Sequence, residues 1–151
     1  MTNKIGVHAL VWVGGWSEAE SEQAIAATAA CGYDLIEVPL LDPRSVDPEI
    51  TARQLENHGI GASTSLGLSF DTDISSTDPE RVARGEALLN DALSVARDMG
   101  ATYLGGVLFS ALNKYPEQAT VDGRRNSVEV LARLADKAKA SGITLGLEAV
   151  N

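Results

Sequence analysis

The sequence has little of several features that would assign it to a class at once. Cys31 is its only cysteine, which excludes an internal disulfide and a cysteine-based zinc site. We expect this residue to be a small buried side chain near a helix end. Basic residues never occur in a run of more than two, and 12 basic against 21 acidic residues give a net charge of −9. A nucleic-acid or anionic-membrane partner is therefore not expected.

Long apolar stretches are also missing. None approaches the roughly 20 residues of a membrane span, and the first residues lack the basic end and apolar segment of a signal peptide. These absences predict a cytoplasmic protein with no membrane partner. With 151 residues and 44% hydrophobic content, the chain is long enough for one core and hardly for two. Residues 1–151 are therefore predicted to form part of a single domain, without an internal boundary.

What the sequence does have is a regular alternation of helix-like and strand-like segments. Four glycines each close a helix-like segment, as left-handed caps commonly do, and a strand-like apolar run follows each of them. The glycines are Gly32, Gly59, Gly100 and Gly142, and the runs are residues 35–41, 61–68, 103–109 and 143–150. With an opening strand over residues 4–11, the predicted order is β-α-β-α-β-α-β-α-β. This order indicates an α/β fold with a parallel sheet covered by helices.

The helical segments show the expected period. Apolar residues recur every three or four positions over residues 82–99 and again over residues 128–138. Asn126 and Glu129 form a possible capping pair for the second of these helices.

The polar residues help to choose between two architectures for this order. An open nucleotide-binding sheet needs a glycine-rich phosphate loop after its first strand, and residues 11–16 match no such motif. Small, polar and aromatic residues instead follow the strands: His8, Trp12, Ser65, Gly67, Ser69, Ser110 and Glu148. Such side chains at the carboxyl ends of successive parallel strands are typical of the active face of a (β/α)₈ TIM barrel. Because such barrels need about 200 residues or more, five strands and four helices would be the amino-terminal part of one.

Glu148 is the most informative of these residues. It is a lone carboxylate at the far end of the apolar run that begins at Ile143. A carboxylate at the end of a buried strand needs a partner, which can be a metal, a substrate or a basic side chain.

Six segments carry a resemblance to a known family, and they follow one another over essentially the whole chain. They are residues Lys4–Trp12, Tyr33–Pro39, Ser63–Leu68, Asp73–Ser76, Gly105–Leu108 and Leu147–Asn151. Together they resemble the amino-terminal half of the ketose 3-epimerases, which act on D-tagatose, D-allulose (psicose) or L-ribulose and belong to the xylose isomerase-like barrel superfamily. The resemblance implies an isomerase of carbohydrate metabolism that inverts C3 of a free ketose.

The resemblance also implies a metal and a catalytic role for Glu148. In that family two glutamates, an aspartate and a histidine hold a divalent ion, usually Mn²⁺, with Co²⁺ or Mg²⁺ as alternatives. Glu148 matches the first of these ligands and also one of two acid–base carboxylates. Inverting C3 removes a proton next to a carbonyl, so the charge of an enediolate must be stabilised, which a metal on O2 and O3 would do. Two carboxylates on opposite faces would then remove and return the proton.

The substrate-binding residues that the resemblance implies are His8, Trp12, Trp16, Leu66, Val107 and Leu108. His8 stands where the family places a ring against the sugar, and the two tryptophans would form a wall at its apolar end. The three aliphatic residues would restrict the size of the distal carbons. Packing alone is the alternative for each of them. Glu37 also matches a family glutamate, and we expect it to have a structural, hydrogen-bonded role in the barrel interior.

The remaining metal ligands and the second catalytic carboxylate of the family are not in this sequence. We therefore expect an incomplete chain that is inactive alone, and a full-length enzyme that forms a dimer or tetramer. Two other hypotheses stay open. One is another barrel enzyme of the superfamily, of the hydroxypyruvate isomerase or inosose dehydratase type. The other is a non-catalytic half-barrel that pairs with itself.

Overall fold

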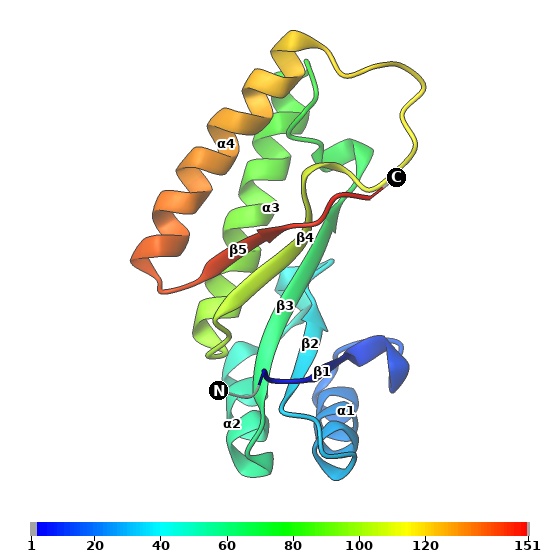
Figure 1. Cartoon of the computed structure of the whole chain (residues 1–151), viewed down its shortest axis with the longest axis vertical. Coiled ribbons are helices and arrows are strands. Elements are labelled where there is room, and N and C mark those ends of the chain that lie inside the picture. Colours follow the sequence, from blue (N-terminus) through cyan, green and yellow to red (C-terminus); the bar gives the residue numbers. More distant parts are fainter. Residues whose placement is uncertain (1–2, 151) are drawn as a thin grey trace.

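Five parallel strands lie side by side, in the order in which they occur along the chain, and form one curved sheet (Figure 1). The computed structural model describes residues 3–150. The strands are β1 (Gly6–His8), β2 (Leu35–Pro39), β3 (Gly61–Leu68), β4 (Tyr103–Ala111) and β5 (Thr144–Leu147). Within the described residues β1 and β5 are the two edges of the sheet.

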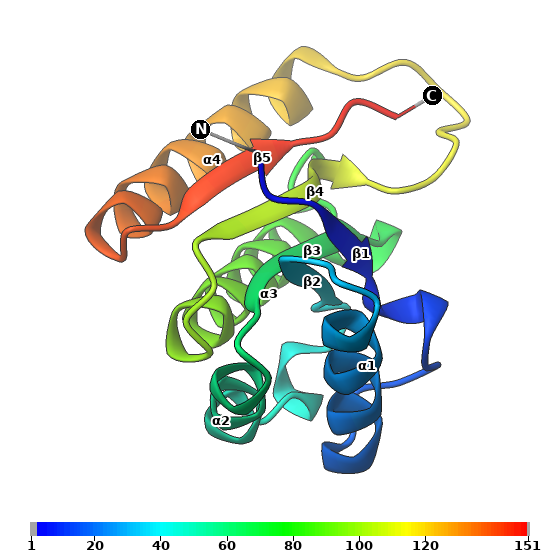
Figure 2. The ribbon, with the colours of Figure 1, turned by 60° about the horizontal axis from the view of Figure 1, so that its bottom comes forward.

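Four helices alternate with the strands and pack on one face of the sheet (Figure 2). They are α1 (Glu18–Ala30), α2 (Pro48–His58), α3 (Pro79–Asp98) and α4 (Val121–Ala140). The predicted alternation of five strands and four helices is confirmed. None of the helices within residues 3–150 combines the length and apolar content needed to cross a membrane.

The first three helices begin at side chains that bind their free backbone amides. Ser17 and Glu20 form a capping box at the start of α1. Asp47 and Asp78 cap α2 and α3, and each is followed by a proline in the first turn. The expectation that Cys31 is buried is wrong, because this residue follows the last turn of α1 and is exposed.

Helix α4 begins earlier than its apolar period indicated. Thr120 accepts a hydrogen bond from the amide of Gly123 at 3.0 Å, so the helix starts at Val121. The predicted capping role of Asn126 is wrong. Asn126 lies within α4, after the first turn, and its side chain donates to the carbonyl oxygen of Ser76 at 2.9 Å, which ties α4 to the loop before α3.

Strand β1 is shorter than the predicted run of residues 4–11. The amide of Leu10 donates to Nδ1 of His8 at 3.1 Å, and residues Ala9–Val11 form a short 3₁₀ helix instead of continuing the strand. His8 is therefore the last residue of β1. The hydrogen bond from the Leu10 amide also fixes the orientation of the His8 ring.

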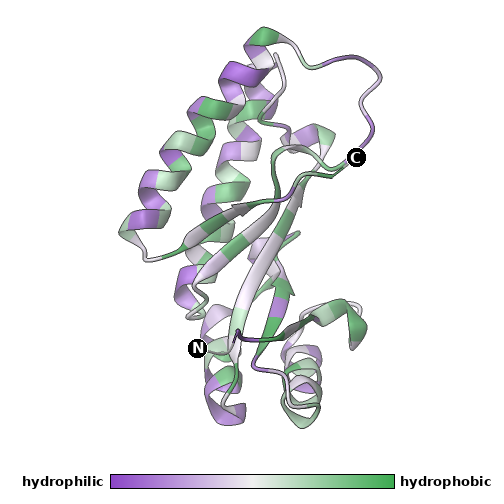
Figure 3. Ribbon diagram, viewed as in Figure 1, coloured by the Kyte–Doolittle hydropathy of each residue, from purple (hydrophilic) through white to green (hydrophobic). Residues whose placement is uncertain are grey.

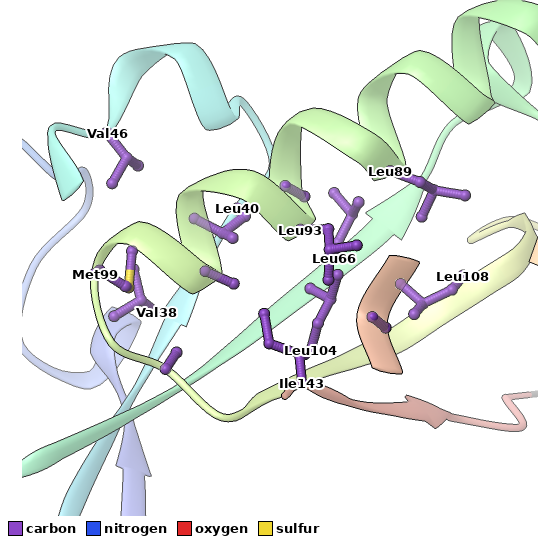
Figure 4. Close-up of a cluster of buried hydrophobic side chains, with 14 of the residues drawn as sticks. Val38, Leu40, Val46, Leu66, Leu89, Leu93, Met99, Leu104, Leu108 and Ile143 are labelled. Carbon is purple, nitrogen blue, oxygen red and sulfur yellow. The ribbon is translucent and has the colours of Figure 1, made fainter. Parts of the chain in front are cut away.

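The hydrophobic core lies between the sheet and the helices (Figure 4). On β3 the side chains alternate: Thr64, Leu66 and Leu68 are buried, whereas Ser63 and Ser65 face the other side and are only partly covered. Hydrophilic and hydrophobic residues also alternate along α3 and α4 (Figure 3). The packing that holds this fold together is thus on the helix side of the sheet.

The inner face of the curved sheet is lined by small residues at its amino-terminal end. The ring of Tyr103 lies over Gly105 and Gly146, and a β-carbon at either glycine would clash with it. Leu35 on β2 covers Gly6 on β1 in the same way, toward the other edge of the sheet. Large side chains on β2 and β4 therefore fill the space that glycines leave on the same strand or on the neighbouring strand.

Candidate active site

The candidate site lies at the carboxyl-terminal ends of the strands, because parallel strands bring these ends together. Glu148 follows β5 directly, and its amide donates to the carbonyl oxygen of Gly106 at 2.9 Å. This bond continues the β4–β5 ladder by one residue. Side-chain alternation then places Glu148 on the inner face, with Gly146 two residues before it.

The carboxylate of Glu148 is exposed. Within residues 3–150 burial does not force a partner on it, because β5 is an edge strand there and does not enclose its carboxyl end. An exposed carboxylate on the inner face is free to meet a ligand. The motif Leu147–Asn151 is described only as far as Val150, and Asn151 lies outside the described residues.

His8 and Glu37 form a pair on neighbouring strands. They are opposite each other in the β1–β2 register, with His8 Nε2 3.7 Å from Glu37 Oε1, and their side chains are 36% and 41% exposed. Since Nδ1 of His8 accepts the Leu10 amide, a neutral ring carries its proton on Nε2, on the Glu37 side. At 3.7 Å the contact is longer than the hydrogen bond expected for Glu37, which is also less enclosed than expected.

Both tryptophans are fixed by helices. Trp12 Nε1 donates to Thr28 of α1 at 3.0 Å, and Trp16 Nε1 donates to Thr51 of α2 at 3.1 Å. Each indole is partly buried and packs against the hydrophobic core. These contacts favour packing for both rings.

The three aliphatic residues do not share one environment. Leu66 and Leu108 are 2% and 0% exposed and lie in the core between sheet and helices (Figure 4). Their placement favours packing over contact with a substrate. Val107 is also buried, but it pairs with Gly67 just before the β3–β4 register shifts. Unlike Leu66 and Leu108, it does not belong to the core cluster between the sheet and the helices.

A buried carboxylate to which the sequence assigned no role joins two loops at the carboxyl ends of the strands. Asp73 is 4% exposed and accepts hydrogen bonds from the amide and hydroxyl of Ser75 at 2.8 and 2.7 Å. Its other oxygen accepts the hydroxyl of Tyr115 at 2.7 Å, and that hydroxyl in turn accepts the Ala111 amide at 2.8 Å. The spacing of Asp73 and Ser75 is typical of a local turn, whereas a partner 42 residues away leaves no sequence signal.

The Tyr115 hydroxyl makes the fold sensitive to high pH. Burial raises the pKa of this phenol above its usual range, and the bond that it donates to Asp73 acts in the same direction. Because the pKa of Tyr115 is higher in the folded than in the unfolded chain, the protonated phenol stabilises the fold. This stabilisation is fully present below about pH 10, the pKa of a tyrosine in the unfolded chain. This stabilisation is lost as the pH rises through the folded value.

We therefore expect wild-type protein to be more stable than Tyr115→Phe at pH 8, and the difference in the free energy of unfolding to shrink above about pH 10. Urea unfolding of both proteins at several pH values measures this difference. Both proteins contain the other tyrosines, so the effect of their ionisation cancels in the difference between the two free energies of unfolding. A difference that stays constant to pH 11 would contradict the assignment.

The donors of this chain fit one position of a metal site rather than a whole site. Among residues 3–150 no three side chains of the His, Cys, Asp and Glu types come together as a metal-binding group. Glu148 offers one exposed carboxylate, the oxygen type that Mn²⁺ and Mg²⁺ bind. Affinity needs several converging donors, so further ligands would have to join it.

Comparison with known proteins assigns the chain to a family. Residues 25–151 match the model of the xylose isomerase-like TIM barrel family. The chain is 48% identical to an L-ribulose 3-epimerase of Methylomonas sp. (strain DH-1) over 146 residues, and 46% identical to a ketose 3-epimerase of Arthrobacter globiformis over 148 residues. These matches cover 97% and 98% of this chain but 51% of each relative.

A solved structure agrees with these matches. The crystal structure of a Methylomonas sp. D-allulose 3-epimerase in complex with D-allulose has a TM-score of 0.94 and 47% identity, and the match covers 99% of this chain and 53% of that one. The chain thus spans about half the length of the curated relatives that it matches. The parallel sheet and the helices that cover it are consistent with the family model. The chain belongs to the xylose isomerase-like TIM barrel family.

Proposed function

We propose that this chain supplies the amino-terminal half of the active face of a metal-dependent ketose 3-epimerase, an isomerase that inverts C3 of a free ketose. The observation that carries the proposal is the exposed carboxylate of Glu148 on the inner face, directly after β5. Support also comes from the relatives, which are named as L-ribulose or ketose 3-epimerases and match almost the whole of this chain.

Glu148 has two roles in this proposal. It acts as one of the two bases that exchange the C3 proton, and it provides one of several metal ligands. A divalent metal, with Mn²⁺ as first choice and Co²⁺ or Mg²⁺ as alternatives, supplies positive charge that stabilises an enediolate. The exposure of Glu148 allows both roles, because neither a substrate nor an ion has to displace a protein partner from it.

His8 is the best-placed substrate ligand among the residues expected to bind. Its Nε2–H faces the loosely held carboxylate of Glu37 at 3.7 Å, so the ring can exchange this contact for a sugar hydroxyl. Val107 remains a proposed pocket residue beside the inner face. Trp12 and Trp16 remain candidates for an apolar wall, although their N–H groups are held by α1 and α2. For Leu66 and Leu108 we propose packing instead.

The remaining parts of the proposal concern the complete enzyme. We propose that the second base and the other metal ligands come from the part of the barrel that corresponds to the second half of the relatives. We also propose that the enzyme works in the cytoplasm as a dimer or tetramer.

An extended chain tests the activity. Residues 1–151 are joined to the carboxyl-terminal half of the Methylomonas L-ribulose 3-epimerase, which is 48% identical over the shared half. With Mn²⁺ we expect this chain to interconvert D-fructose and D-allulose, or the tagatose or ribulose pairs, as measured by liquid chromatography. We expect the 151-residue chain alone to give no turnover, because it supplies only one of the two catalytic carboxylates that the proposed reaction needs.

The same assay separates the alternatives. A folded extended chain that acts on none of these ketoses would reject the epimerase. Consumption of hydroxypyruvate or an inosose instead would indicate another enzyme type of the superfamily. A stable dimer of the 151-residue chain in light scattering would favour the self-pairing half-barrel.

A further inference from the structure

The loop between β4 and α4, residues 112–120, is held to the rest of the structure at three points. At its start the Leu112 amide donates to the Leu68 carbonyl oxygen at 2.7 Å. At its end the Thr120 side chain caps α4. Near its middle the side chain of Tyr115 reaches Asp73, which lies in the loop between β3 and α3.

The contact at Tyr115 is the most specific of the three. One hydroxyl donates to Asp73 at 2.7 Å and accepts the Ala111 amide at 2.8 Å, and it also lies 3.3 Å from the hydroxyl of Ser75. The ring packs edge-on against Phe70, with the centroids 5.2 Å apart and the planes at 84°. A single side chain thus joins the end of β4 and the two loops that follow β3 and β4.

The loop between β3 and α3 is a firm support for this contact. Ser76 accepts the side-chain amide of Asn126 from α4 at 2.9 Å. Gly123 lies so close to the Ser75 carbonyl oxygen that a β-carbon would clash with it. Asp73 is therefore fixed from α4 as well as by its own turn, so Tyr115 is anchored to a rigid part of the structure.

This loop lies beside the segment that carries the candidate catalytic residue. In both Figure 1 and Figure 2 the loop between β4 and α4, in yellow, runs next to the segment that follows β5, in red. That segment contains Glu148, whose amide bonds to β4 at Gly106. The loop and the segment that carries Glu148 are therefore neighbours at the carboxyl ends of the strands.

We propose that Tyr115 is a positioning residue, which Asp73 holds by its hydroxyl so that the loop of residues 112–120 forms a fixed wall of the substrate site beside Glu148. This inference rests on the proposed epimerase function. Tyr115 itself does not touch the reacting atoms, because its hydroxyl is already occupied by Asp73 and Ala111.

The Tyr115→Phe variant tests the inference, because it removes only the hydroxyl and keeps the ring against Phe70. Buried Asp73 then loses one hydrogen bond and the Ala111 amide loses its acceptor. In the 151-residue chain we expect amide hydrogen exchange over residues 112–120 to become about tenfold faster, with exchange in α1 unchanged. Tyr33→Phe is the matched control, since it removes a hydroxyl just before the amino end of β2, whereas the loop of residues 112–120 follows the carboxyl end of β4.

The second measurement is kinetic and uses the extended chain with D-fructose and Mn²⁺. A loosened wall weakens the binding of ground state and transition state alike, so we expect Tyr115→Phe to raise KM about tenfold and to change kcat less than twofold. Tyr33→Phe should leave both constants unchanged. A role in stability alone would lower the midpoint of unfolding without moving KM.

The outcomes distinguish the two proposals. Unchanged exchange over residues 112–120, or an unchanged KM in an active extended chain, overturns the positioning role. An extended chain that is inactive with Tyr115 present counts against the epimerase. In that case faster exchange would still support the tether, and unchanged exchange would still overturn it.

Discussion

Replacing Glu148 by glutamine in the extended chain is expected to lower the turnover of ketoses about a thousandfold or more. General base catalysis contributes about 10²–10⁴ in rate, and glutamine cannot accept the C3 proton. Loss of a negatively charged oxygen ligand also weakens the hold on a divalent ion. Both effects act on the same reaction, so the activity should fall to the background of the assay.

The fold should not change in this variant. The Glu148 side chain is exposed, and only its backbone amide takes part in the sheet. We therefore expect the unfolding midpoint of Glu148→Gln to match that of wild type. Glu129→Gln, which makes the same change at an exposed position on α4, is the control and should keep full activity. Turnover by Glu148→Gln within tenfold of wild type would remove Glu148 from the mechanism.

Gly106→Ala is expected to destabilise the 151-residue chain by about 4 kcal/mol, the largest effect on stability that we predict for a single residue. Gly106 lies in β4 with φ at 115°, where other residues are strained. A β-carbon there would also overlap the carbonyl oxygen of Leu66 on β3, and the backbone cannot move without breaking the β3–β4 pairing. Strain and overpacking each cost about 1–3 kcal/mol.

Gly100 provides a matched control for this prediction. It also has a positive φ, 81°, but a β-carbon there would meet open space. Gly100→Ala should therefore cost about 1 kcal/mol, from backbone strain alone. Urea unfolding followed by circular dichroism measures both variants. Equal losses at the two positions would show that the clash with Leu66 does not contribute.

The glycines that end helices were the most reliable guide to the fold. Gly32, Gly59, Gly100 and Gly142 all have positive φ values, as the cap interpretation requires. The strand over residues 61–68 agrees with β3 at both ends. These features follow from local chemistry, which a sequence displays directly.

Features that depend on contacts between distant segments were not visible. The first turns of α4 were missed because they carry few apolar residues, and Thr120 alone marks the true start. The side of the sheet that Leu66 faces follows from strand register, which periodicity leaves open. The role of Tyr115 depends on Asp73 in another loop. Glu148 was found because a charged residue after an apolar strand contrasts with its neighbours.

The order of the sheet has a consequence for how the protein is made. Each strand pairs with the strand that precedes it in the chain, and the buried side chains lie between those strands and the intervening helices. A βα unit therefore finds its packing partner among residues that have already left the ribosome, which favours folding from the amino terminus during synthesis. Contacts between sequence neighbours also shorten the search for the native pairing. A ribosome-bound chain should thus become resistant to protease in steps, one βα unit after another.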